Sequence, residues 1–184
     1  MKPPRFDYED PRTLEEALKL LDDHPDECKI LSGGQSLMPM LNMRLVRPKV
    51  IVDINRIQGL NYVQPWNDGV AVGANVPVKQ IERARLFSER VPVICEAILH
   101  IAHPQIRSRG TICGSIAHAD PAAELPALAV ALNAEMIATG AKETRTISSN
   151  EFFVSYFTTT LKPNEILTEV RFPAAPANMA WSFL

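Results

Sequence analysis

Two short glycine-bearing segments constrain the fold of this chain most: residues 32–36, with the sequence SGGQS, and residues 110–115, with the sequence GTICGS. Each ends an apolar run and precedes a helical pattern. Glycine adopts positive φ and lets the backbone approach a ligand closely, so consecutive amide N–H groups can converge on an anion. A helix start adds further N–H groups and its positive dipole end. One Gly-Gly pair is typical of a turn, but two such segments predict a phosphate clamp.

Composition places the chain among ordinary soluble globular proteins. It has 184 residues, 46% hydrophobic and 22% charged, enough for one domain or two small ones. The net charge of −2 gives no general attraction to nucleic acid or to an anionic membrane. Because the N-terminus lacks a secretory apolar segment and no stretch is long enough to span a bilayer, we expect a cytoplasmic protein.

The cysteines give no sign of a metal site. Cys28, Cys95 and Cys113 are odd in number and lack C-x-x-C spacing, so neither a disulfide framework nor a zinc or iron–sulfur ligand set is expected. Any metal chemistry would therefore come from a partner. We interpret Cys113 as a small apolar residue, although a redox-sensitive thiol is the alternative.

The absence of two common nucleotide-binding motifs limits which ligands the clamp could hold. There is no G-x-G-x-x-G motif of a Rossmann site and no P-loop. Two separated segments that meet on one ligand suit an elongated diphosphate. Arg107 and Arg109 precede the second segment and could help to neutralise a phosphate.

Hydrophobic periodicity predicts a mixed α and β chain. A capping box at residues 13–16 opens a helix over residues 13–23. Residues 28–31 are predicted to form a short buried strand, Ser36 to cap a short helix, and residues 49–54 to form a second strand. A change in composition near residues 58–61 indicates a boundary between a small N-terminal unit and a larger one.

The larger unit is predicted to combine strands with amphipathic helices. Strands are expected at residues 61–64, 69–73, 135–139, 144–147 and 166–172, and helices at residues 78–83, 93–102, 121–132 and 151–156. The helix over residues 93–102 would deliver the chain to the second glycine segment. Trp181 and Phe183, beyond a linker-like stretch, would anchor a further domain or contact a partner chain.

A family resemblance rests on both glycine segments. Residues 29–39, KILSGGQSLMP, and residues 109–121, RGTICGSIAHADP, resemble the two flavin-binding signatures of the medium subunit of molybdenum hydroxylases. The chain is similar to the medium subunit of carbon monoxide dehydrogenase and to the flavin domain of xanthine dehydrogenase. Further matches at residues 72–74, 151–153 and 165–170 extend the resemblance across nearly the whole sequence.

The resemblance implies an α+β fold with two subdomains, of the vanillyl-alcohol oxidase (PCMH-like) type. A small N-terminal α/β subdomain, residues 1–57, and a larger α+β subdomain, residues 58–175, would hold FAD between them. Residues 176–184 would be a linker or the start of a missing C-terminal domain, because the family's C-terminal segment has no counterpart after about residue 175.

The resemblance also implies which residues bind FAD. Residues 32–36 and 111–115 would wrap the diphosphate, Glu124 would reach a ribose or adenine edge, and Ile166 or Leu167 would use backbone groups on the adenine side. His118 is weighed evenly between a ligand contact and a structural role, and Asp120 is explained by capping. The full predicted set is Lys29, Ile30, Leu31, Ser32, Gly33, Gly34, Gln35, Ser36, Leu37, Ile101, Ala102, Ile106, Gly110, Thr111, Cys113, Gly114, Ser115, His118, Asp120, Glu124, Ile166 and Leu167.

The function implied by the resemblance is that of an oxidoreductase subunit without catalytic residues of its own. Electrons would leave a molybdopterin centre in a large subunit, pass two [2Fe–2S] clusters in a small subunit, and reduce FAD held by this chain, which passes them to a final acceptor. The chain would be one part of a hetero-oligomer, and its task would be to position and tune the flavin.

Two other functions stay open. A non-catalytic assembly module, descended from such a flavoprotein, would dock partner subunits without binding flavin. A free-standing flavin oxidase of the same wider fold would turn over a small substrate with oxygen. The lack of an obvious base or flavin-linking histidine counts against the oxidase.

Overall fold

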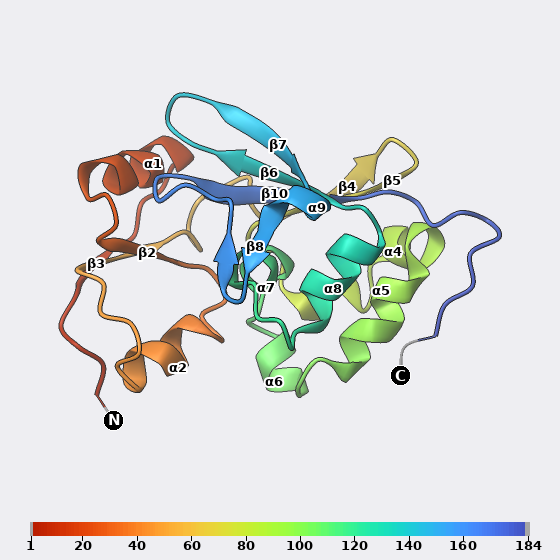
Figure 1. Ribbon diagram of the computed structural model, residues 1–184, viewed down its shortest axis with the longest axis horizontal. Helices are drawn as coiled ribbons and strands as arrows, with labels where there is room; N and C mark the ends of the chain where they lie inside the picture. The colour runs from red at the N-terminus through yellow and green to blue at the C-terminus, as the bar shows by residue number, and fades with distance from the viewer. Residues whose placement is uncertain (1, 183–184) are drawn as a thin grey trace.

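Two larger sheets organise the chain in the computed structural model, which describes residues 2–182 (Figure 1). The first has three parallel strands in the order β1-β3-β2, and the second has five antiparallel strands in the order β4-β5-β10-β6-β7. The strands of the first sheet are β1 (Asp7–Glu9), β2 (Cys28–Leu31) and β3 (Val50–Asp53). Those of the second are β4 (Val63–Trp66), β5 (Gly69–Gly73), β6 (Glu135–Thr139), β7 (Thr144–Ser148) and β10 (Ile166–Phe172).

Helices cover both sheets. Figure 1 shows α1 (Leu14–Asp23) and α2 (Leu37–Asn42) on opposite sides of the three-stranded sheet, and the helices from α4 to α8 below the five-stranded sheet. The remaining helical elements are α3 (Val78–Ile81), α4 (Arg85–Arg90), α5 (Pro92–Ala97), η1 (Ile98–His100), α6 (Pro104–Arg107), α7 (Ile112–His118), α8 (Glu124–Ala131) and α9 (Ser149–Phe152). A small hairpin of β8 (Phe153–Ser155) and β9 (Thr158–Thr159) follows α9. No helix within residues 2–182 combines the length and apolar character needed to cross a bilayer.

The start of α1 confirms the predicted capping box. The Thr13 hydroxyl accepts a hydrogen bond from the Glu16 amide at 3.2 Å, and the Glu16 carboxylate accepts one from the Thr13 amide at 3.3 Å. Two backbone donors without helical partners are thereby satisfied. The apolar face of α1 is buried in the core through Ala17, Leu18 and Leu21.

The central strand β10 joins the five-stranded sheet to its helices. It pairs with β5 on one side and β6 on the other, and six of its seven residues are buried. Its Phe172 packs edge-to-face on Phe87 of α4, with ring centroids 6.1 Å apart. The strands predicted within residues 28–31, 49–54, 69–73, 135–139, 144–147 and 166–172 are confirmed, although β2 is only partly buried.

The long helix predicted over residues 93–102 is wrong. The helix α5 continues only into the 3-10 turn η1, and Ala102 then takes a φ of 41°. Arg107 donates through Nη1 to the carbonyl oxygens of Ile101 and Ala102, at 2.9 and 3.3 Å. Pro104 also disfavours a helical conformation at His103, which is extended. The chain therefore turns before α6.

Other predictions also need correction. The strand expected at residues 61–64 is β4, at Val63–Trp66, and the helix expected at residues 78–83 ends at Ile81. Ser36 stands at the start of α2 but makes no side-chain capping bond, because its backbone is helical where such caps require an extended residue. The helix predicted over residues 151–156 ends at Phe152, and residues 153–155 pair as β8. The helix α8 begins at Glu124 and not at residue 121, because the Asp120 carboxylate accepts a hydrogen bond from the Ala122 amide at 2.9 Å and holds a turn.

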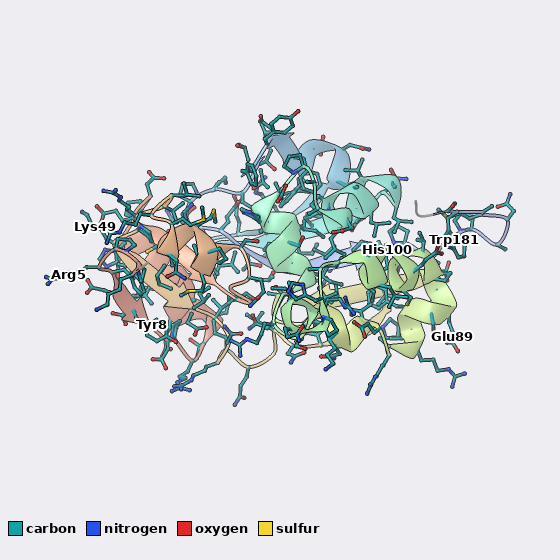
Figure 2. All side chains as sticks on the ribbon, turned by 90° about the horizontal axis from the view of Figure 1, so that it is seen from below. Arg5, Tyr8, Lys49, Glu89, His100 and Trp181 are labelled. Carbon is teal, nitrogen blue, oxygen red and sulfur yellow. The ribbon has the colours of Figure 1, made fainter. Side chains whose placement is uncertain are left out.

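Trp181 lies against α5. Its indole N–H donates to the Glu96 carboxylate at 2.7 Å, and 38% of the residue is exposed. Figure 2 shows Trp181 at the end of the molecule opposite Arg5 and Lys49. The prediction for Phe183 lies outside the described residues.

Candidate functional site

The two glycine segments lie directly against each other. A Cβ atom on Gly33 would be 2.3 Å from the carbonyl oxygen of Arg109 and 2.7 Å from the Cα of Gly110. No larger residue permits this approach. Gly34 adds a φ of 72°, in the left-handed region that glycine tolerates best. The predicted convergence of the two segments is therefore confirmed.

A chain of hydrogen bonds fastens the two segments together. The hydroxyl oxygens of Thr111 and Ser32 are 3.2 Å apart, and the Ser32 hydroxyl donates to Asn75 Oδ1 at 2.9 Å. Asn75 in turn donates to the carbonyl oxygen of Ile54 at 2.6 Å. Thr111 also accepts from the Gly114 amide at 3.1 Å, so it caps α7. Asn75, 8% exposed and just beyond β5, links the end of β3 to both segments.

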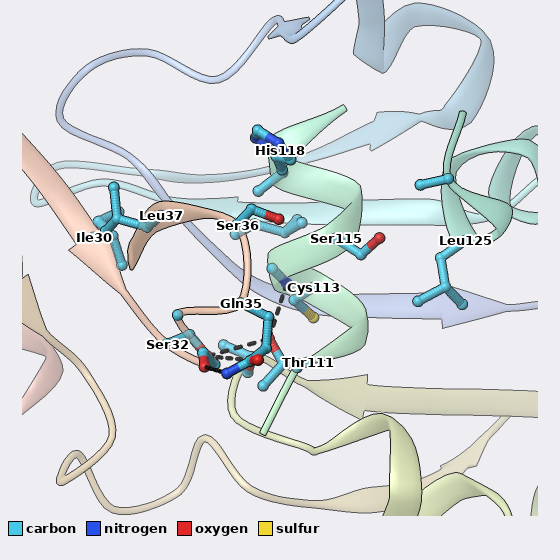
Figure 3. Close-up of a pocket in the computed structure, with 18 of the residues that line it drawn as sticks. Ile30, Ser32, Gln35, Ser36, Leu37, Thr111, Cys113, Ser115, His118 and Leu125 are labelled. Carbon is cyan, nitrogen blue, oxygen red and sulfur yellow. Dashed lines mark hydrogen bonds between the residues drawn. The ribbon is translucent and has the colours of Figure 1, made fainter. Parts of the chain in front are cut away.

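A cavity of about 520 Å³ opens beside this contact (Figure 3). Its volume falls within the range of about 300–1,000 Å³ that is typical of small-molecule and cofactor sites. The walls come from the segment between β2 and α2, from α7, from the start of α8 and from β10. Parts of both sheets therefore contribute to one space.

Most of the residues predicted to bind FAD line this cavity. They are Lys29, Ile30, Ser32, Gly33, Gly34, Gln35, Ser36, Leu37, Ile101, Ile106, Gly110, Thr111, Cys113, Gly114, Ser115, His118, Glu124, Ile166 and Leu167. The structure thus brings together residues from the whole length of the sequence.

Three predicted residues do not line the cavity within the described part of the chain. Leu31 packs close to the first segment, since its Cδ1 is 3.0 Å from the position that a Cβ on Gly34 would take. Ala102 is exposed in the turn before α6, where its carbonyl group accepts from Arg107. Asp120 holds the turn before α8. Each of them shapes an element that borders the site.

Several lining residues lie outside the predicted FAD-binding set, although Arg107 was expected near a phosphate. They are Met40, Val46, Ile54, Ala74, Val78, Arg107, Ala117, Ala123, Leu125, Phe157, Leu161 and Glu165. Most are apolar residues, and no motif in the sequence marks them as ligand contacts. Asn75 and Phe157 carry no sequence signal for this site, because their roles depend on which elements pack together.

The arginines before the second segment have separate surroundings. Arg107 is 9% exposed and donates through Nε to the Glu82 carboxylate at 2.7 Å, so an internal partner already neutralises its charge. Arg109 is exposed and lines a second cavity of about 180 Å³, which Asn55 and Asn61 also border. The two arginines therefore do not converge on one ligand.

An ion pair between the partly exposed Arg145 and the buried Glu165 fixes the segment that leads into β10. Arg145 donates through Nε and Nη2 to both oxygens of the Glu165 carboxylate, each at 2.8 Å, and the Lys162 amide adds a bond of 2.8 Å. The guanidinium group of Arg145 lowers the pKa of Glu165 below its ordinary value. Glu165 therefore stays ionised at neutral pH, next to Ile166 and Leu167 in the cavity wall.

Cys113 has the environment of an apolar residue. It is 2% exposed, and its Sγ lies 3.7 Å from the carbonyl oxygen of Val72 on β5. Burial raises the pKa of the Cys113 thiol, so the thiolate is disfavoured at neutral pH. The interpretation as a small apolar residue is confirmed. Among the described residues, no group of three or more His, Cys, Asp or Glu side chains is arranged to hold a metal ion.

The chain is similar to parts of proteins named as subunits of dehydrogenases. It is 44% identical over 183 residues to "6-hydroxypseudooxynicotine dehydrogenase complex subunit alpha" of Paenarthrobacter nicotinovorans, and 41% identical over 184 residues to "Caffeine dehydrogenase subunit beta" of Pseudomonas sp. (strain CBB1). Each match covers 100% of this chain and 62% of the relative. The chain therefore spans less than two thirds of these curated relatives.

The fold also matches solved structures. A carbon monoxide dehydrogenase from Hydrogenophaga pseudoflava, which lacks the Mo-pyranopterin moiety of the molybdenum cofactor, superposes with a TM-score of 0.95 at 38% identity, over 99% of this chain and 63% of that chain. Quinoline 2-oxidoreductase from Pseudomonas putida 86 gives a TM-score of 0.92 at 35% identity, over 96% and 61%.

One protein family, described by the cofactor that it binds, matches nearly the whole chain. Residues 4–175 match the family described as "FAD binding domain in molybdopterin dehydrogenase". The two converging glycine segments lie within this range, and so do all the residues that line the cavity. The chain belongs to the family of FAD-binding domains of molybdopterin dehydrogenases.

Proposed function

We propose that this chain holds FAD as the medium-subunit part of a molybdenum-containing dehydrogenase. The observation that carries the proposal is the contact of the two glycine segments beside one cavity. In the proposed complex, the organic substrate is oxidised at a molybdopterin centre of a large partner subunit, and electrons arrive through the iron–sulfur clusters of a small partner subunit. Bound FAD would supply the redox chemistry that relays them to a final acceptor.

The residues present suit a dinucleotide. Backbone groups of residues 32–36 and 111–115 would hold the diphosphate, since the glycines leave the main chain open to close approach. The hydroxyl groups of Ser32 and Thr111 are already oriented by each other and by Asn75. Apolar side chains, among them Ile101, would exclude water from the bound group.

The proposal includes a finer architecture and a location. We assign residues 1–57 and 58–175 to two subdomains of a vanillyl-alcohol oxidase type fold that hold FAD between them. The separate three-stranded and five-stranded sheets support this division. We also propose a cytoplasmic location, in line with the sequence. The "complex subunit" and "subunit beta" in the names of the relatives support a role within a hetero-oligomer.

The test is flavin content, measured on the purified chain and after reconstitution with FAD. We expect flavin absorbance in the wild type and its loss in Gly33→Val, whose side chain would collide with the Arg109 carbonyl group and separate the segments. Because Gly33→Val also threatens folding, Ser36→Phe is a second variant that fills the cavity from an exposed position without a capping bond to lose. Asn42→Phe, exposed at the far end of α2 and outside the cavity lining, is the matched control.

The outcomes separate this function from its rival. A folded chain that takes up no FAD, alone or with its partner subunits, contradicts the proposal. Binding of partner subunits by such a flavin-free chain would favour the assembly module. Equal flavin content in Ser36→Phe and Asn42→Phe would show that flavin binds outside this cavity.

A further inference from the structure

Two aromatic rings stand together at the end of the cavity. His118 is the last residue of α7, and Phe157 lies in the turn between β8 and β9. Both side chains line the cavity, and their ring centroids are 5.1 Å apart with an angle of 48° between the planes. Phe157 is nevertheless 58% exposed, so much of this residue stays accessible beside the cavity.

The backbone holds Phe157 in an unfavourable conformation at this place. Its φ is 55°, in the left-handed region that bulky residues rarely adopt. The Phe157 amide donates to the carbonyl oxygen of Ala119 at 2.9 Å, and Ala119, the residue after α7, has a φ of 52°. Glycine or asparagine would fit such a position with less strain. Strained residues of this kind cluster at ligand sites.

The distance from the ring pair of His118 and Phe157 to the glycine segments suits an elongated ligand. Thr111 caps the first turn of α7, and His118 ends the helix. Seven residues at the helical rise of 1.5 Å separate them by about 10 Å. A dinucleotide carries a planar ring on either side of its diphosphate, several bonds away. A diphosphate held at the glycine segments therefore leaves one of these rings within reach of His118 and Phe157.

We propose that His118 and Phe157 form the contact face for one planar ring of the dinucleotide, either the adenine or the isoalloxazine, and that Phe157 sets the affinity for that ring. This inference rests on the proposed FAD function. Stacking of a base on an aromatic side chain contributes about 1–3 kcal/mol, as measured by alanine substitution. Offset or tilted ring arrangements are the favoured geometries for such contacts.

The experiment is an equilibrium titration of the flavin-free protein with FAD, with ADP and FMN as competitors. We expect the Kd for FAD to rise at least about fivefold in Phe157→Ala and Phe157→Gly. Phe157→Gly also relieves the positive φ, so it separates the ring from the backbone strain. Phe157→Tyr, which keeps a ring, should stay near the wild type. Tyr156→Ala is the matched control, because Tyr156 is 75% exposed in the same turn but outside the cavity lining.

The two competitors identify the ring. If the Phe157 variants bind both FAD and ADP more weakly but bind FMN as the wild type does, the ring is adenine. If they bind both FAD and FMN more weakly but bind ADP as the wild type does, the ring is the isoalloxazine. The proposal is overturned if the Kd values of ADP and FMN both rise or both stay the same, and also if the Kd for FAD is unchanged. Failure of the wild type to bind FAD is a different result, since it contradicts the proposed function. Thermal unfolding of each variant checks that it is folded.

Discussion

A single amide side chain joins the two halves of the candidate site. Asn75 donates to the end of β3 and accepts from the first glycine segment, whose Ser32 hydroxyl contacts Thr111 of the second. It is 8% exposed, and both of its polar atoms have partners. Buried polar groups satisfied in this way specify one arrangement of the groups around them.

Asn75→Ala is expected to loosen the contact between the glycine segments. Removing the amide takes one hydrogen bond from the Ile54 carbonyl group and one from the Ser32 hydroxyl, so we expect a loss of about 1–2 kcal/mol in the free energy of unfolding. Urea denaturation measures this, and FAD affinity should fall as well. Asn61→Ala removes an exposed asparagine nearby and serves as control. Equal stability of the two variants would contradict the role of Asn75.

At the scale of elements, the connection between β9 and β10 depends on one ion pair with β7. Glu165 is 4% exposed and accepts from Arg145 and from the Lys162 amide, while Arg145 also donates to the Thr160 carbonyl group at 2.7 Å. These bonds close the turn that precedes the cavity residues Ile166 and Leu167.

Glu165→Gln is expected to reduce the loss of unfolding free energy at low pH. The pKa of Glu165 is lowered in the folded state from an ordinary value of 4.5. Its stabilising contribution is therefore present above pH 4.5 and is lost as the pH falls below 4.5 through the lowered pKa. Urea unfolding at pH 7 and at successively lower pH should show a smaller acid loss in Glu165→Gln than in the wild type. Glu143→Gln, which alters an exposed pair with Lys162, is the matched control, and an acid loss in Glu165→Gln equal to that of the control would contradict the expectation.

What the sequence predicted well is local. The helix α1 follows from a capping box and a repeat of apolar residues, and β10 from a run of alternating residues. The break after η1 was not predictable, because the Arg107 side chain that binds the carbonyl groups of residues 101 and 102 returns from α6 and pairs with Glu82.

The residues of the candidate site also fall into two groups, those that the sequence predicts and those that it does not. The glycine segments could be found because each carries a motif, and the family resemblance led to most of the residues that line the cavity. Asn75 and Phe157 could not be found, since their roles depend on how β5 and the hairpin of β8 and β9 pack beside α7. Positions that act through tertiary contacts leave no short-range pattern.

At the scale of the whole molecule, the candidate site lies where two sheets share one core. A single cluster of buried apolar residues includes Leu18 of α1, Val52 of β3 and Val170 of β10. The cavity draws its walls from β2, α2, α7 and β10 and from the segments between them. Binding there should therefore stabilise both sheets at once, because neither sheet forms the site alone.

FAD is expected to raise the midpoint of one cooperative unfolding transition. At a free concentration one hundred times its Kd, a ligand that binds only the folded state adds about 2.7 kcal/mol to stability. Far-UV circular dichroism and tryptophan fluorescence should move together, since Trp66 lies in the five-stranded sheet and the dichroism reports all elements. Ser36→Phe should abolish the shift and Asn42→Phe should retain it. Separate transitions, of which FAD moves only one, would mean that the two sheets are independent and that the cavity between them does not hold the cofactor.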